Sequence, residues 1–307
     1  MSKILQDIKK NFQGLAVIVV FILGCLLLFF AGKMVYKVIF KKDIRIEYYQ
    51  NRLSAEVKRI NTVVESAQKT PQDLAYILEF HEANIDEMNI LLESVLFNNE
   101  ELYGSCIAFE PYRLEKDSLY NSCYAYREND VVKYTNLNGE KYNYFYKDWY
   151  LIPKTLKKPV WSEPYYDEGG GNSLMSTYSV PFYKLNGNKE TFNGIVTVDV
   201  SVDWLTDFVK SVGRTLSGYP ILVSENGTII SAFNKELIFH ETIFTLAEEN
   251  NLPILRQIGR ALQHGKRGYI AIDKPIKGKK WYAFYCPVPA NKWGLIILVP
   301  ESELYDD

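Results

Sequence analysis

Four stretches decide the fold: Tyr142-Asn-Tyr-Phe-Tyr-Lys-Asp-Trp-Tyr150, Trp161-Ser-Glu-Pro-Tyr-Tyr-Asp167, Thr177-Tyr-Ser-Val-Pro-Phe182 and Gly194-Ile-Val-Thr-Val-Asp-Val-Ser-Val-Asp-Trp-Leu205. The first is dense in aromatic residues and predicts a short helix. The third and fourth lie in β-rich runs and predict neighbouring strands. The fourth then changes to a helical pattern, with its apolar residues on one side. These stretches together predict a sheet flanked by short helices.

Further strands are predicted on both sides of these stretches. A hairpin with an Asn-Gly turn at Asn226-Gly227 opens a second group of strands. The predicted strands are 103–110, 121–127, 131–135, 174–183, 194–200, 219–224, 229–232, 268–273, 280–287 and 293–299. Short helices are expected over 142–151 and 201–212, and over 236–264 with an interruption at Pro253. The chain is therefore predicted to be α+β, with two successive units built on antiparallel sheets.

A long helix is predicted before the first strand. Leu53, Val57, Ile60 and Val64 recur at i, i+4, i+7 and i+11, which is one face of a helix. Thr70-Pro71 matches an N-cap followed by proline at the first helical position, so a new helix is predicted to start there. Residues 44–97 are therefore expected to form a long, broken helix.

The N-terminal segment is apolar enough to cross a membrane. No residue between Lys10 and Lys33 is charged, and Leu15–Ala31 is almost wholly apolar. This reaches the roughly 20 residues that a helix needs to span the hydrocarbon core. The alternative is a cleaved signal peptide, whose apolar region is usually shorter, about 7–15 residues. We expect a tail over 1–13 and a transmembrane helix over 14–32.

Composition excludes several functional classes. The net charge of −2 argues against nucleic-acid binding. The chain has no phosphate-binding GxxxxGK[ST] motif, and its three histidines show no metal or triad spacing. We therefore expect no catalytic residues, no metal site and no cofactor. Cys106 and Cys123 lie on adjacent predicted strands, so the choice between a disulfide and two buried thiols stays open at this point.

The four quoted stretches resemble the double-Cache family of bacterial extracytoplasmic sensors, over residues 44–301. The resemblance implies two stacked PAS-like units on a long N-terminal helix. It divides the chain into a stalk helix region (33–100), a membrane-distal, ligand-binding unit (101–216) and a membrane-proximal unit (217–301). Residues 302–307 would begin a link to a second transmembrane helix outside this chain.

Members that bind amino acids carry a pocket pattern that falls on six residues here. Asp199 would pair with a ligand ammonium group, and Lys147 with a carboxylate. The remaining four would form aromatic walls: Tyr142, Trp149, Tyr150 and Tyr165. The family has arginine where this chain has Lys147, and lysine cannot form the bidentate pair with a carboxylate. An amine is therefore as good a candidate as an amino acid.

Other readings of these residues remain open. Trp149 and Tyr150 are also typical of core aromatics, Lys147 of an exposed lysine, and Asp199 of a cap for the helix predicted near Ser201. As a whole, the chain is expected to be a sensor module that transmits a helix shift across a membrane. The alternatives are a ligand-free interaction scaffold and a membrane-tethered hydrolase.

The resemblance also implies partners and location. The partners are a small amine, amino acid or carboxylate, the membrane, and a second copy bound through the stalk helix. The sensor would be periplasmic or extracellular at the bacterial inner membrane, with a kinase, cyclase or serine phosphatase output beyond residue 307. The lysines after the span, Lys33 to Lys42, predict the opposite orientation by the positive-inside rule.

Overall fold

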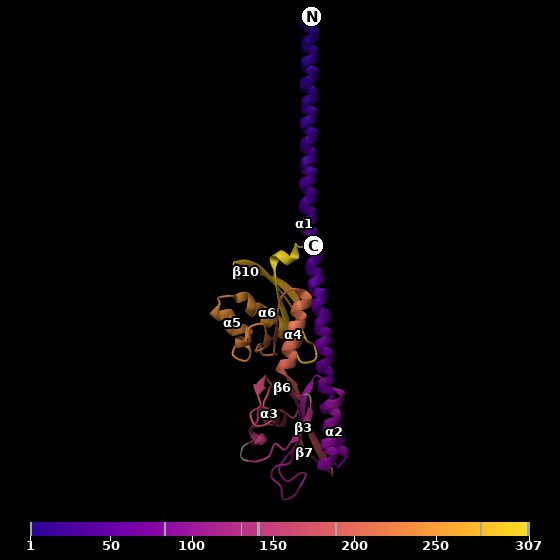
Figure 1. Cartoon of the computed structure of the whole chain (residues 1–307), viewed down its shortest axis with the longest axis vertical. Helices are drawn as coiled ribbons and strands as arrows, with labels where there is room; N and C mark the ends of the chain where they lie inside the picture. Colours follow the sequence, from indigo (N-terminus) through magenta and orange to yellow (C-terminus); the bar gives the residue numbers. More distant parts are fainter. Residues whose placement is uncertain are drawn as a thin grey trace.

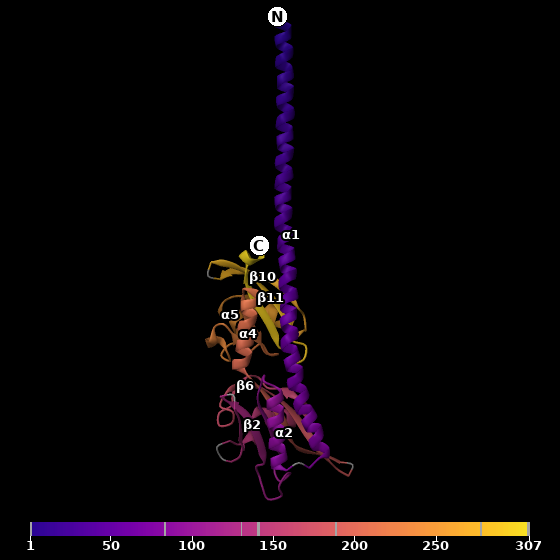
Figure 2. The same cartoon turned by 45° about the vertical axis from the view of Figure 1, so that its right-hand side comes forward.

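A computed structural model describes residues 2–82, 84–129, 131–139, 142–187, 189–276 and 278–305. One long helix, α1 (Ser2–Phe80), runs beside two sheet-containing units and projects far beyond them at its N-terminal end (Figure 1). The C-terminus lies beside α1, at the end of the body from which the helix projects (Figure 2). The predicted α+β architecture, a long helix with two antiparallel sheets, is confirmed.

The first sheet has the strand order β3-β2-β1-β7-β6-β4, and β5 pairs with β6 beside β4. Its strands are β1 (Leu102–Phe109), β2 (Ser122–Glu128), β3 (Val131–Thr135), β4 (Val160–Trp161), β5 (Tyr165–Tyr166), β6 (Leu174–Asn186) and β7 (Lys189–Ser201). Its helical segments are α2 (Ile85–Asn98), η1 (Tyr144–Tyr146) and α3 (Asp148–Leu156). The single short helix expected at 142–151 is thus two segments.

The second sheet has the order β10-β11-β12-β8-β9. Its strands are β8 (Tyr219–Val223), β9 (Ile229–Ala232), β10 (Gly268–Ile276), β11 (Lys279–Pro287) and β12 (Gly294–Pro300). The helical segments are α4 (Val202–Leu216), η2 (Lys235–Leu237), α5 (Ile243–Glu249), α6 (Pro253–Gln263) and η3 (Glu301–Leu304). The predicted strands and the β8–β9 hairpin are confirmed.

The C-terminal half of α1 holds both sheets through one buried stripe. Its side chains pack in a single hydrophobic core with residues of both sheets. Near the projecting end, the Tyr49 ring stacks on Phe284 of β11 at 5.2 Å between centroids. Farther along, Gln72 donates a hydrogen bond to the Tyr178 hydroxyl of β6 at 3.0 Å. The buried stripe comprises Ile46, Tyr49, Leu53, Val57, Ile60, Val64, Ala67, Leu74, Ala75 and Leu78.

The prediction of a helix start at Thr70 is wrong. Pro71 lies inside α1, and the Thr70 hydroxyl donates to the Ser66 carbonyl one turn back instead of capping a new helix. Packing explains the difference, because Leu74 and Leu78 continue the buried stripe beyond the proline. Instead, α1 ends at Phe80 and α2 begins at Ile85, where Asn84 and Glu87 form a capping box.

No disulfide joins Cys106 to Cys123, and both thiols are free. The register pairs Cys106 with Tyr124, and Ile107 with Cys123. Since residues directly opposite each other share a face and neighbours along a strand alternate, the two cysteines point to opposite faces of the sheet. The sequence alternative of two buried thiols is therefore correct.

The N-terminal part of α1 has no protein around it. Of the described helices, this one is long and apolar enough to cross a membrane, and its side chains from Val20 to Tyr36 are exposed. A hydrophobic surface of this length in water would be very unfavourable. Such a segment fits a membrane anchor.

The capping box gives a test of the α1–α2 boundary. Asn84→Ala removes the side-chain acceptor for the Glu87 amide and should lower the free energy of unfolding by about 1 kcal/mol. Asn98→Ala, at the exposed far end of α2, is the matched control. Equal effects of the two substitutions in urea denaturation would contradict the assigned boundary.

Candidate functional site

The site lies on the face of the first sheet that α1 and α2 leave uncovered. Thr177 of β6 stands directly opposite Asp199 of β7. Because side chains alternate along a strand, Tyr178 points to the other face, where Gln72 of α1 meets it. Adjacent residues of β6 therefore connect the site on one face with the long helix on the other.

Asp199 is a buried carboxylate with only 3% of its surface exposed. Thr177 Oγ1 donates to Asp199 Oδ1 at 2.7 Å, and the Tyr124 hydroxyl donates to Oδ2 at 3.0 Å. The Tyr165 hydroxyl lies 2.8 Å from Thr177 Oγ1 and extends the network. Gly104 permits this close packing, since a Cβ there would come within 2.7 Å of Asp199 Oδ2.

A second buried carboxylate, Asp167, belongs to the same site. Its Oδ1 accepts a hydrogen bond from the Tyr142 hydroxyl at 2.5 Å, and its Oδ2 accepts from the Gly171 amide at 2.9 Å. The Trp149 indole N–H donates to the Tyr142 oxygen at 3.1 Å, while the Tyr103 hydroxyl donates to the Gly171 carbonyl at 2.5 Å. The glycine-rich loop at 169–171 is thereby held down over the aromatic side chains.

The site holds two buried carboxyl groups, those of Asp199 and Asp167, without a basic side chain from the described part of the chain bonded to either. Within the described ranges, no lysine or arginine forms a hydrogen bond or ion pair with Asp199 or Asp167. Burial raises the pKa of Asp199 to about 7; the nearby Asp167 charge also raises it, whereas the Thr177 and Tyr124 hydrogen bonds lower it. Burial likewise raises the pKa of the Tyr124 and Tyr165 hydroxyls, so these groups remain donors at neutral pH.

The structure brings four of the six sequence-predicted residues into this network: Tyr142, Trp149, Tyr165 and Asp199. Lys147 lies at its edge, half-buried, with Nζ 4.5 Å from the centroid of the Tyr142 ring. Tyr150 points elsewhere, since its hydroxyl donates to Glu110 Oε2 at 2.8 Å. The role of these residues in ligand binding stays a prediction.

The alternative role of Asp199 as a helix cap is wrong. The Ser201 hydroxyl accepts from the Trp204 amide at 3.1 Å and caps α4, which leaves Asp199 to the buried network. Asp167, Tyr124 and Thr177 were not predicted from the sequence as site residues. Asp167 could have been found from its place between two tyrosines and three glycines, while Tyr124 required knowledge of the β1–β2 pairing.

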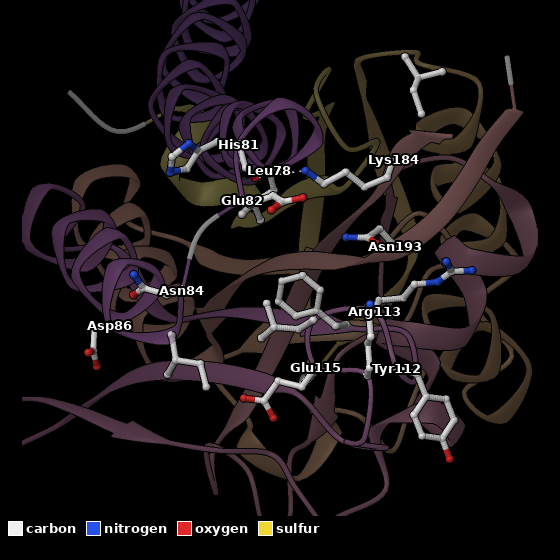
Figure 3. Close-up of a pocket in the computed structure, with 15 residues that line it drawn as sticks. Leu78, His81, Glu82, Asn84, Asp86, Tyr112, Arg113, Glu115, Lys184 and Asn193 are labelled. Carbon is white, nitrogen blue, oxygen red and sulfur yellow. Dashed lines mark hydrogen bonds between the residues drawn. The ribbon is translucent and has the colours of Figure 1, made fainter. Parts of the chain in front are cut away.

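A cavity of about 910 Å³ is lined by none of the residues of this network. Figure 3 shows the side chains that line it. It opens at the end of the body farthest from the N-terminus, between the end of α1, the β1–β2 loop and the β6–β7 hairpin. The described residues contain no cluster of three histidine, cysteine or carboxylate side chains that could hold a metal ion.

Comparison with known proteins agrees with the two-sheet fold. Residues 88–207 match the family described as the methyl-accepting chemotaxis protein-like, first PDC sensor domain. No curated protein sequence matches the chain. The expected likeness to double-Cache sensor domains is thus shown for the fold, and residues 88–207 are similar to a first PDC sensor domain.

Three solved structures illustrate this likeness. An extracellular domain assigned to the histidine kinase mmHK1S-Z3 shares 24% identity, covering 86% of this chain and 96% of its own, with a TM-score of 0.69. The structure named methyl-accepting chemotaxis protein X shares 17%, covering 84% and 98%, with a TM-score of 0.68. The ligand-binding domain of the Pseudomonas aeruginosa amino-acid chemoreceptor PctC, in complex with GABA, shares 17%, covering 83% and 99%, with a TM-score of 0.56.

The raised pKa of Asp199 predicts a pH-dependent stability. The carboxyl keeps its proton in the folded state up to about pH 7, while the unfolded chain releases it near the ordinary value of 3.8. The free energy of unfolding should therefore fall as pH rises between these values, by at most about 1.4 kcal/mol for each pH unit. Asp199→Asn should abolish this fall, measured by denaturation from about pH 4 to pH 8.

Asp203→Asn, at the exposed first turn of α4, serves as the control and should keep the wild-type profile. Identical pH profiles for Asp199→Asn and the wild type would show that Asp199 is already ionised in the folded protein.

Proposed function

We propose that the chain is the sensor part of a transmembrane receptor and that its first sheet unit binds a small molecule with an ammonium group. The observation that carries this proposal is the buried, aromatic-lined Asp199 with Asp167 near it and no cation bonded to either within the described ranges. A buried carboxylate is costly without a positive partner. A ligand ammonium would supply that partner and restore the charged form of Asp199.

The aromatic side chains suit the same ligand. Tyr124 and Tyr142 donate their hydroxyls to the two carboxylates. Tyr165 and Trp149 join this network through Thr177 and Tyr142. An ammonium group packed against such rings gains about 0.5–2 kcal/mol from cation–π attraction. The tyrosine hydroxyls that now donate to the carboxylates can turn to other acceptors when the ammonium arrives.

Lys147 is the basic residue at the edge of the site that could attract a carboxylate at the other end of the ligand. Its ammonium already lies over the Tyr142 ring at the edge of the site, and lysine acts as a point charge. A carboxylate at that end would be attracted without being held in a fixed geometry. The proposed ligands are therefore simple amines and amino acids whose carboxylate lies away from the amine, such as the GABA found in the PctC complex.

Entry of a ligand requires the loop at 169–171 to lift. Its position is held by contacts that include Tyr142 with Asp167, the Gly171 amide with Asp167 and Tyr103 with Gly171. An ammonium that binds between the aspartates would compete for the first of these contacts. Ligand binding would therefore break the hydrogen bond between Tyr142 and Asp167, and this break would release the loop.

The route to the membrane is proposed to run through β6. Thr177 contacts Asp199, and the next residue, Tyr178, accepts a hydrogen bond from Gln72 of α1. The Tyr178 ring also packs on Trp161 at 5.2 Å between centroids, and Trp161 contacts Trp293 beside the second sheet at 5.4 Å. A displacement of β6 on ligand binding would therefore reach α1 and the second unit together.

The proposal extends to location and assembly. The apolar part of α1 would anchor the chain in a bacterial inner membrane, with the two sheet units outside the cytoplasm. A second copy would pack along the stalk, where Tyr76 and Phe80 of α1 and Ile90 and Phe97 of α2 expose large apolar side chains. The output part of such a receptor would receive the helix shift.

Ligand binding is tested by thermal unfolding of the full chain in detergent against alkylamines, α-amino acids, γ-aminobutyrate and carboxylates without an amine. An ammonium ligand at 100 times its dissociation constant should add about 2.7 kcal/mol to the free energy of unfolding. Asp199→Asn should remove this stabilisation, and Asp203→Asn should retain it. Stabilisation by amine-free carboxylates alone would contradict the assignment.

Transmission is tested by hydrogen exchange along α1. In the wild type, ligand should alter the hydrogen exchange of residues 66–78. Tyr178→Phe loses only the acceptor for Gln72. This variant should show a smaller change in exchange, while its affinity for the ligand should stay within about twofold of wild type. Tyr76→Phe, on the exposed side of the same helix, is the control. An undiminished response in Tyr178→Phe would exclude this contact from the route.

A further inference from the structure

The cavity at the far end of the body is built by four separate segments of the chain (Figure 3). The end of α1 and the start of α2 form one wall, the β1–β2 loop forms the opposite wall, and β6 and β7 lie between them. Its volume of about 910 Å³ lies in the range of about 300–1,000 Å³ that is usual for ligand pockets. This cavity is separate from the Asp199 network, so a role for it does not depend on the proposed function.

Asn193 gives the cavity a directed polar group. Only 7% of its surface is exposed, it lines the cavity, and its side-chain amide has no hydrogen-bond partner among the described residues. The β6–β7 register explains its position: Phe182 pairs with Gly194 and Tyr183 with Phe192, so Asn193 is the extra residue of a β-bulge. A bulge of this kind re-aims a side chain and is frequent beside binding sites.

Unpaired charges of both signs surround the cavity. Arg113 on one wall is exposed and has no hydrogen-bond or ion-pair partner for its guanidinium in the described part of the chain; the carboxylates of Glu82 and Glu115 likewise have none. Figure 3 shows Glu82 and Arg113 on different sides of Asn193. Lys184 reaches across the top, where its ammonium donates to the His81 carbonyl at 3.3 Å.

The backbone of the wall that carries Arg113 is strained. Tyr112, an exposed aromatic residue at the rim, has a φ of +61°, in the left-handed region that side chains other than glycine rarely adopt. Its amide donates to the Ser118 carbonyl at 3.1 Å, which fixes the turn that presents Tyr112 and Arg113 to the cavity.

We infer that this cavity is a second binding site and that its ligand is a short peptide. The Asn193 amide carries a donor and an acceptor at the spacing of a peptide group, so it can pair with both the N–H and the C=O of a ligand backbone. Arg113 suits the ligand's carboxylate end, and Glu82 suits its ammonium end. Leu78, Phe109 and Leu185 supply apolar contacts for ligand side chains.

Other classes of ligand fit this lining less well. A simple anion would face the carboxylates of Glu82, Asp86 and Glu115, and a simple cation would face Arg113, Lys116 and Lys184. An uncharged polyol would leave both sets of charges unused. A zwitterion with an internal amide is the chemistry that uses the asparagine and both signs of charge.

The test uses the full chain in detergent micelles and twenty tripeptides Ala-X-Ala, one for each amino acid X, by saturation-transfer NMR and then calorimetry. At least one tripeptide should bind with a dissociation constant below about 1 mM. The same tripeptide with an acetylated N-terminus and an amidated C-terminus should bind at least about tenfold more weakly, because both charge-assisted contacts are lost.

Variants locate the binding. Asn193→Leu and Arg113→Ala should each weaken the tripeptide by about tenfold, whereas Asp199→Asn should bind it as the wild type does. Arg113 is exposed, so its variant should fold even if Asn193→Leu does not. The inference is overturned if no tripeptide binds, if Arg113→Ala binds with wild-type affinity, or if Asp199→Asn abolishes binding.

Discussion

The packing of one helix face against two sheets is the constraint on which the rest of this structure depends. Ten of the buried side chains of α1 between Ile46 and Leu78 join residues of both sheets in one hydrophobic core. Each fully buried aliphatic side chain contributes about 1.5–3 kcal/mol relative to exposure. Because the same helix continues into the apolar segment, we propose that a movement between helix and sheets is passed along it toward that segment.

This constraint also explains why the two faces of the first sheet differ. The α1 and α2 side is filled mainly by aliphatic residues, while the other side holds most of the tyrosines, Trp149 and the two aspartates. Because side chains alternate along β6, Thr177 and Tyr178 point to opposite faces of the sheet. Thr177 contacts Asp199 in the site, and Tyr178 contacts Gln72 of α1. The polar network is confined to the side where opening it does not break the main core.

Local sequence signals predicted the strands well, because alternation and turn residues such as Asn226-Gly227 reflect constraints within a few residues. They gave wrong predictions where packing between residues far apart in the sequence determines the structure. Thr70-Pro71 has every local mark of a helix start, but the buried stripe continues through it to Leu78. The cysteine pairing depended on the β1–β2 register, which places Cys106 and Cys123 on opposite faces. Within the site, resemblance predicted Asp199 and three aromatic partners, whereas Asp167 and Tyr124 required the pairing of strands and loops in three dimensions.

We propose that a ligand ammonium pairs with ionised Asp199, in which case ligand binding must release the proton that Asp199 carries. Calorimetric titration at pH 7 in buffers of different ionisation enthalpy measures the protons exchanged when the best-binding amine or amino acid is added to the full chain. With a pKa of about 7, Asp199 is about half protonated, so binding should release about half a proton, and Asp199→Asn should release none. Binding without proton release, equally strong in Asp199→Asn, would contradict the account.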